Sequence, residues 1–99
     1  MEKRVEMKFS VLVEVRLLPG IADPQGATLE RSLPALGFDD VEQVRVGKAI
    51  RLVVSATDEQ IALERTRELC SQVLANPVME DARITLQPLS QPETAGNPA

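Results

Sequence analysis

The side chains that most often do catalytic chemistry are scarce in this chain. The sequence has no histidine and a single cysteine, Cys70. Histidine is the commonest general base and metal ligand near neutral pH, and one cysteine cannot complete a zinc site. Cys70 lies on the apolar side of a predicted helix without a histidine to activate its thiol, so we expect it to pack in the core. These residues indicate no catalytic, cofactor or metal centre.

Two acidic pairs are the remaining candidates for acid–base chemistry. They are Asp39-Asp40 and Glu80-Asp81. A catalytic carboxylate dyad needs two carboxyl groups held at a fixed separation across a substrate. Both pairs adjoin predicted turns beside the starts of strands, so solvated turn residues are the favoured interpretation and a dyad is the alternative.

The segment Asp23-Pro24-Gln25-Gly26 has residue types typical of a loop that turns into the first turn of a helix, and we call it the corner. The Asp23 side chain can accept from the free N–H groups of the first turn, and Pro24 occupies a position where no donor is needed. Gly26 costs about 1 kcal/mol relative to alanine in a helix, and its missing side chain lets another backbone come close. We therefore predict a contact at this corner, with Asp23 serving first as a cap.

A second turn, Gly47-Lys48, lies between two runs rich in valine and suits a tight β-hairpin. Arg45 and Lys48 flank it and could bind a phosphate or an acidic surface; a solvated hairpin explains them equally well. Asn76-Pro77 is interpreted as a helix stop, because asparagine tolerates the left-handed conformation and proline cannot continue a helix.

Hydrophobic periodicity predicts the elements that position these turns. The stripe Leu29, Leu33 and Leu36 marks a helix face, with Pro34 expected to kink the helix or tighten its last turn. The predicted elements are a strand over Lys8–Leu18, a helix from Pro24 to Gly37, strands over Val41–Val46 and Ala49–Ala56, a helix from Thr57 to Asn76, and a strand over Ala82–Gln87.

The order β-α-β-β-α-β is that of a ferredoxin-like plait, an α+β fold with an antiparallel sheet and two helices on one face. We predict one domain over residues 8–87, a frayed N-terminus over residues 1–7, in which Met7 is an alternative start, and a disordered proline-containing tail over residues 88–99. On the sheet face away from the helices, Leu12 and Val53 could seed self-association.

Composition excludes several kinds of partner. The formal net charge is −4 and the pI is about 4.8, whereas neutralising phosphates needs a basic face, so no nucleic-acid partner is predicted. No apolar run approaches the roughly 18 residues of a membrane span, and the first residues lack the apolar segment of a signal peptide. We therefore expect no membrane contact and a cytoplasmic location, which a single cysteine also fits.

Four spaced segments stand out together, in this order: Leu18-Pro19-Gly20 through Asp23-Pro24-Gln25-Gly26, then Leu36-Gly37-Phe38, then Val44-Arg45-Val46-Gly47-Lys48, and finally Leu74-Ala75-Asn76-Pro77-Val78-Met79-Glu80-Asp81. Together they resemble the PurS family, the small subunit of phosphoribosylformylglycinamidine (FGAM) synthase in organisms that split this purine-biosynthesis enzyme into three chains. The resemblance covers about Lys8 to Leu86 and implies the plait or a PurS-like variant of it.

The resemblance implies a subunit that catalyses nothing itself. In that system the glutaminase subunit PurQ releases ammonia, and the large synthetase subunit PurL uses ATP with Mg to activate the substrate amide for attack by that ammonia. The small subunit holds no cofactor; as a homodimer or higher oligomer it joins the two partners.

The family's shared corners fall on nine positions, for which the resemblance implies subunit contacts or the shaping of loops. They are Asp23, Pro24, Gln25, Gly26, Arg45, Gly47, Lys48, Asn76 and Pro77. The alternative function is a free-standing plait that binds a small ligand and regulates an enzyme. That function would need a cluster of polar side chains at a dimer cleft.

Overall fold

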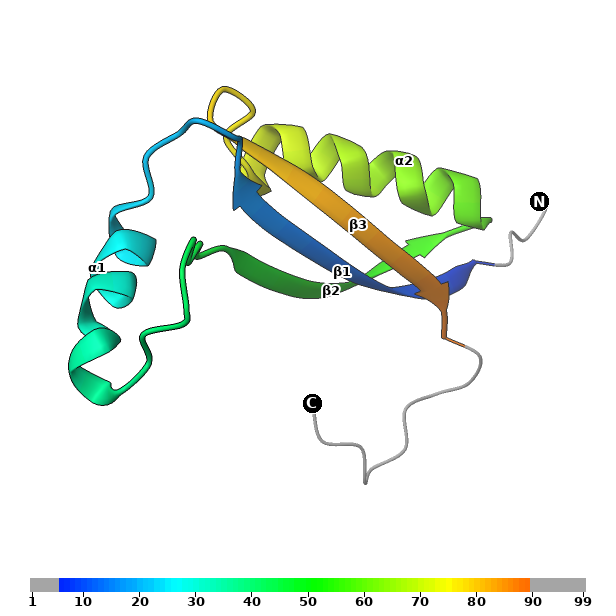
Figure 1. Cartoon of the computed structure of the whole chain (residues 1–99). Helices are drawn as coiled ribbons and strands as arrows, with labels where there is room; N and C mark the ends of the chain where they lie inside the picture. Colours follow the sequence, from blue (N-terminus) through cyan, green and yellow to red (C-terminus); the bar gives the residue numbers. More distant parts are fainter. Residues whose placement is uncertain (1–5, 90–99) are drawn as a thin grey trace, which may run out of the picture.

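A twisted three-stranded antiparallel sheet forms the frame of the molecule (Figure 1). The structure, a computed structural model, describes residues 6–89. The strands are β1 (Met7–Leu17), β2 (Lys48–Ala56) and β3 (Glu80–Pro88), in the spatial order β2-β1-β3. β1 is central because its alternate residues are apolar and its pairing uses both edges, with Phe9 opposite Val54 on β2 and Pro88 on β3.

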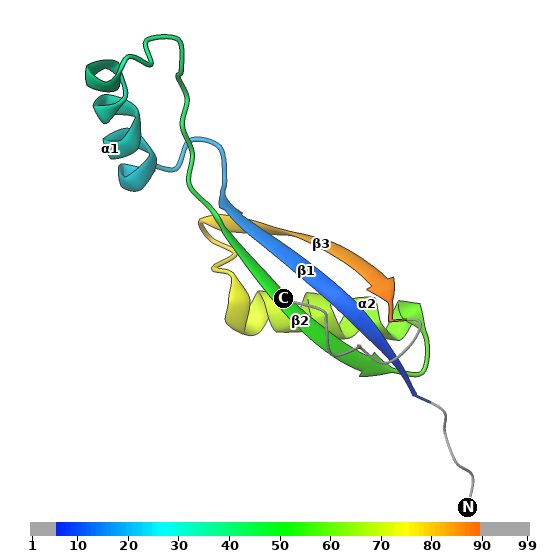
Figure 2. The ribbon, with the colours of Figure 1, turned by 90° about the horizontal axis from the view of Figure 1, so that it is seen from below.

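One helix, α2 (Glu59–Leu69), covers one face of the sheet (Figures 1 and 2). Asp58 caps it by accepting a hydrogen bond from the Ile61 backbone N–H at 2.9 Å, and a π-helical turn over Cys70–Leu74 extends it. The buried hydrophobic residues form one small core between α2 and the sheet: Phe9, Val11, Val13, Val15, Ala56, Ala62 and Cys70. The predicted core position of Cys70 is confirmed, and burial raises the pKa of its thiol.

The first helix, α1 (Pro24–Ser32), does not lie on the sheet. It projects beyond the end of the sheet, on the side opposite α2 (Figure 1). Pro34 cannot donate a helical hydrogen bond, so the chain continues as a 3₁₀ turn over Pro34–Leu36, as expected, and stops at Gly37 with φ of 95°. We call residues 22–46, which contain α1 and the segment that returns to the sheet, the lobe.

The α+β class and the antiparallel sheet are confirmed, but two parts of the predicted plait are wrong. Residues 41–47 are not a strand, and Gly47-Lys48 is not a hairpin turn: β2 begins at Lys48 and pairs only with β1. The backbone N–H groups of Val44 and Val46 donate to side-chain carboxylates in the lobe rather than to a neighbouring strand.

The position of α1 follows from the missing strand. A plait uses four strands to support two helices, and one helix suffices to cover the core of this three-stranded sheet. The stripe predicted to face the core is consequently open in part, with Leu29 and Leu36 exposed and Leu33 half-buried.

The ends of the sheet extend slightly past the predicted domain. β1 begins at Met7 and β3 ends at Pro88, each one residue outside the range 8–87. The predicted frayed residues 1–5 and tail residues 90–99 lie outside the described part of the chain. Neither helix within residues 6–89 has the length and apolar character needed to cross a bilayer.

Candidate functional site

The Asp23 carboxylate joins the two ends of the lobe. Its Oδ1 atom accepts a hydrogen bond from the Gly26 N–H at 2.9 Å, which is the predicted helix cap. Its Oδ2 atom accepts from the Val46 N–H at 2.8 Å, which lies just before β2. One side chain therefore caps α1 and fixes the returning segment beside it.

Hydrogen bonding sets the charge state of this corner. The N–H groups of Gly26 and then Val46 lower the pKa of Asp23 below its ordinary value of 3.8, and the nearby Arg45 guanidinium lowers it further against the opposing effect of burial. The group is therefore ionised at neutral pH and accepts both hydrogen bonds.

A pH titration of the lobe tests this role. Because the folded pKa of Asp23 is depressed, its stabilising effect is complete above the unfolded pKa near 3.8 and is lost as the pH falls through the lower folded value. Asp23→Asn keeps one acceptor oxygen, so we expect it to remove this acid transition and to lower hydrogen-exchange protection at Val46. NMR of the Gly26 and Val46 amides measures both effects. Unchanged protection at Val46 in the variant would show that the second hydrogen bond contributes nothing.

Gly26 explains why the returning segment can lie so close to α1. It is buried, and a Cβ built on it would collide with the Val44 carbonyl oxygen. The Glu30 Oε1 atom accepts from the Val44 N–H at 3.0 Å on the same segment. The predicted close approach of a backbone to Gly26 is confirmed, but the backbone belongs to this chain itself, and a partner contact at this corner stays a prediction.

Gly47, Lys48 and Arg45 lie where the lobe meets the sheet. A Cβ on Gly47 would come within 2.7 Å of the Val15 carbonyl oxygen, so this glycine permits close packing of the returning segment on β1. Arg45 donates from Nη2 to the Ile21 carbonyl oxygen at 3.2 Å, and Lys48 is exposed at the first position of β2.

The structure gathers most of the predicted contact residues around one hollow of about 330 Å³ at this end of the sheet. Its lining includes Asp23, Pro24, Gln25, Gly47 and Lys48. Gly26 is buried just inside the corner, and Arg45 lines an adjoining hollow together with Asp23. The start of the lobe and residues 47–48, which follow about 20 residues later in the sequence, therefore form a single surface.

Asn76 and Pro77 lie apart from that surface, in the turn between α2 and β3. The Asn76 Oδ1 atom accepts from the Val78 N–H at 3.0 Å, and the Asn76 N–H donates to Glu80 Oε1 at 2.8 Å. Asn76 does not adopt a positive φ, so it ends the helix through these turn hydrogen bonds and not through a left-handed residue.

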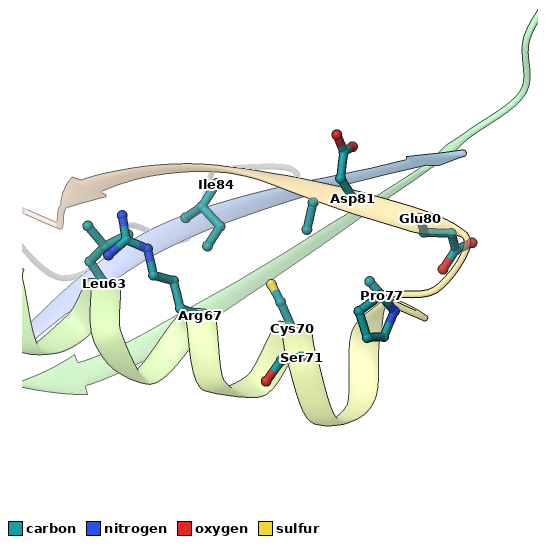
Figure 3. A pocket seen from close by; sticks show the side chains of 10 residues that line it. Leu63, Arg67, Cys70, Ser71, Pro77, Glu80, Asp81 and Ile84 are labelled. Atoms are coloured by element: carbon teal, nitrogen blue, oxygen red, sulfur yellow. The ribbon is translucent and has the colours of Figure 1, made fainter. Parts of the chain in front are cut away.

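Pro77 lines a groove between α2 and β3 that the sequence did not predict (Figure 3). The groove measures about 470 Å³; Arg67 and Cys70 point from the helix toward the sheet, and Ile84 points toward the helix. Asp81 points away to the other side of the sheet. The Cys70 thiol that lines the groove is buried, and burial raises its pKa, so it is a poor nucleophile. Residues 6–89 contain no cluster of three or more side chains that could hold a metal ion.

Comparison with known proteins identifies the family of this chain. A family profile described as "PurS: Phosphoribosylformylglycinamidine (FGAM) synthase" matches residues 10–88. The phosphoribosylformylglycinamidine synthase subunit PurS of Methanocaldococcus jannaschii is 33% identical over 79 residues, which are 80% of this chain and 95% of that protein. The subunit of the same name from a Synechocystis species is 42% identical over 69 residues, which are 70% of this chain and 69% of that one.

Solved structures agree with the sequence comparison. The PurS subunit from Thermotoga maritima superposes with a TM-score of 0.77 at 30% identity, covering 85% of this chain and 97% of that chain. A chain in the structure of PurLQS from the same organism superposes with a TM-score of 0.75 at 31% identity, covering 81% of this chain and 98% of that chain. The family profile, the named relatives and the solved structures all agree: this chain belongs to the PurS family.

Proposed function

We propose that this chain is the PurS subunit of FGAM synthase in de novo purine biosynthesis and that it joins a PurQ-type glutaminase to a PurL-type synthetase. The observation that carries the proposal is its match, over nearly the full length of the relative, to a chain in a solved PurLQS complex. The chain contributes shape and contacts, and the ATP and Mg of the reaction belong to the large partner. It also associates with itself, and the small core of the isolated domain fits such a role.

The physical reason for a joining subunit is the chemistry of ammonia. In neutral water ammonia is mostly ammonium, which has no lone pair with which to attack. A closed path between the site of release and the site of use keeps bulk water away from the nucleophile. A chain that completes this path is essential without touching the bond that breaks.

The lobe is the part of this chain best suited to such contacts. It projects beyond the end of the sheet, and the carboxylates of Asp23 and Glu30 accept hydrogen bonds from the segment that returns to the sheet, which fixes that segment beside α1. A surface fixed in this way loses little conformational freedom when a partner binds. The buried and unpaired Cys70 supports a cytoplasmic location, where thiols stay reduced.

Reconstitution with PurL and PurQ from the same organism tests the proposal. We expect glutamine-dependent FGAM formation to fall to background when this chain is omitted, while ammonia-dependent formation by PurL continues. The ammonia reaction is the internal control, because it shows that PurL is active in every mixture. If omission leaves the glutamine reaction unchanged and no complex forms, the joining role is wrong, and a screen for small ligands of the isolated chain would test the regulatory alternative.

A further inference from the structure

The outer edge of β3 has no strand beside it within residues 6–89, because β3 pairs on one side only, with β1. The Leu18 N–H donates to the Met79 carbonyl oxygen at 2.8 Å, in the register that β1 and β3 share. Hydrogen-bonded pairs alternate along antiparallel strands, so the backbone N–H and C=O groups of Ala82, Ile84 and Leu86 point away from β1. These three residues present a row of backbone donors and acceptors along the edge.

The same edge borders the groove between α2 and β3 (Figure 3). The side chains of Ala82, Ile84 and Leu86 pack toward the core beneath α2, and Leu63 and Cys70 line the helix side of the groove. Directly opposite residues in a sheet place their side chains on the same face, so a strand added to this edge would direct alternate side chains into the groove. We call the outer edge of β3 and the groove together the β3 edge site.

The edge of β3 lacks the usual protection against another strand. Natural sheets protect an open edge with a short strand, a proline or a charged side chain that points inward. β3 is nine residues long, and its one proline, Pro88, is the last of them. None of the residues that face α2 from Ala82 to Leu86 is charged. This edge is therefore suited to accept an extended chain.

Arg67 gives the β3 edge site an unsatisfied positive charge. Its side chain points from α2 toward the sheet, and its guanidinium makes no hydrogen bond or ion pair to the described residues (Figure 3). Glu80 also lines the groove, but its carboxylate accepts from the Asn76 N–H at 2.8 Å, and Asp81 points to the other side of the sheet. A carboxylate that pairs with Arg67 must therefore come from the occupant of the site.

We propose that the β3 edge site binds an extended strand of the PurQ-type glutaminase, with apolar side chains in the groove and a carboxylate paired with Arg67. The strand's backbone bonds to Ala82, Ile84 and Leu86, its apolar side chains leave water, and the ion pair sets its register. The inference rests on the proposed function, because it assigns a place to one of the two chains that this subunit joins.

The choice of occupant follows from the joining role. Under the proposed function, the ammonia reaction of PurL continues without this chain, and only the glutamine reaction depends on it. What this chain must add is a fixed position for the glutaminase, and a row of backbone hydrogen bonds fixes both the position and the direction of a bound strand. β3 of a second copy is a poorer occupant, because its one carboxylate on this face, Glu80, already accepts from Asn76.

Titration of the glutaminase tests the site. PurQ is added to this chain and PurL from the same organism, and the glutamine-dependent rate gives the PurQ concentration at half saturation. We expect Ala82→Pro, which removes an outward N–H, and Arg67→Glu, which places like charges together, each to raise that concentration at least about tenfold. Ala82→Ser keeps the N–H, and Arg65→Glu changes a charge of α2 outside the groove, so both should behave like the unchanged chain.

Hydrogen exchange of the unchanged chain gives a second test that needs no substitution. The Ala82, Ile84 and Leu86 amides should exchange quickly in the free chain and slowly in the full complex. The Arg83 and Thr85 amides point toward β1 and should be slow in both, which makes them the internal control. This measurement decides the question for any variant that circular dichroism shows to be unfolded.

Other occupants give different results. Edge amides that stay fast in the complex, or variants that weaken the binding of PurL and leave that of PurQ unchanged, would overturn the proposal. Edge amides that are slow in the free chain would also overturn it: faster exchange on dilution would assign the edge to a second copy, and faster exchange without residues 90–99 would assign it to the tail. In each of these cases the joining role stands if omitting the chain still abolishes the glutamine reaction. If omission has no effect, the joining role fails and its partner at this site fails with it.

Discussion

Phe9→Ala is expected to lower the free energy of unfolding by about 3–5 kcal/mol, because it removes the largest side chain of a small core. Phe9 is 1% exposed on the central strand, between Val54 on β2 and Pro88 on β3. Only seven hydrophobic residues of the described chain are buried, so few neighbours can move to fill the cavity. Domains of this size are typically stable by about 5–15 kcal/mol, and the loss is a large share of that.

Urea unfolding followed by circular dichroism measures this effect, and the chain supplies its own control. Phe38 is the only other aromatic residue and is half exposed in the lobe, directly after Gly37. At protein concentrations low enough to keep the chain monomeric, Phe38→Ala should change the unfolding midpoint little. Equal losses from the two substitutions would mean that the core is not where the structure places it.

The sheet and its covering helix could be predicted from the sequence because their signals are local. Apolar residues alternate along β1 at Phe9, Val11, Val13, Val15 and Leu17, which predicts one buried face; the first four are buried and Leu17 is half-buried. The apolar run through Cys70 identified the covering helix in the same way. A period of two or of 3.6 residues is a property of neighbouring residues, so no knowledge of distant contacts is needed.

The segment 41–47 could not be predicted because its hydrogen bonds are not local. Val44 and Val46 alternate with polar residues as in a strand, but their N–H groups donate to Glu30 and Asp23, which are 14 and 23 residues earlier. Side chains thus replace the neighbouring strand that alternation implied. An apolar stripe likewise predicted α1 correctly but not what covers it, since the same stripe serves a core or an interface between chains.

At the candidate site, too, local features could be predicted from the sequence and long-range contacts could not. Local chemistry predicts that Asp23 caps the helix and that residue 26 must have no side chain so that another backbone can come close, and both predictions are confirmed. The second hydrogen bond of Asp23, and the packing of Gly47 against Val15, require segments that meet only in the folded chain. The sequence could therefore identify which residues matter at the corner, whereas their partners came from the structure.

Gly26→Ala is expected to open the lobe while the sheet stays folded. The new Cβ would collide with the Val44 carbonyl oxygen and come within 2.8 Å of the Asp23 carboxylate. Moving Asp23 would disturb its hydrogen bonds from Gly26 and Val46, and moving the Val44 backbone would disturb its N–H bond to Glu30. Overpacking of this kind costs about 1–3 kcal/mol. Helix propensity alone acts in the opposite direction, since alanine in place of glycine gains about 1 kcal/mol in a helix.

The opposite signs of these two effects make the result decisive. Hydrogen exchange should show faster exchange at the Val44 and Val46 amides and unchanged protection at Val13 on the central strand. Thr28→Ala, at an exposed position of the same helix, gains the propensity without the collision and should leave the lobe amides protected. If the Gly26→Ala chain is as stable as the unchanged chain, the close approach of Val44 to Gly26 does not hold the lobe together. If the lobe opens as expected, loss of glutamine-dependent activity in the reconstituted enzyme with the sheet intact would locate the joining role in the lobe.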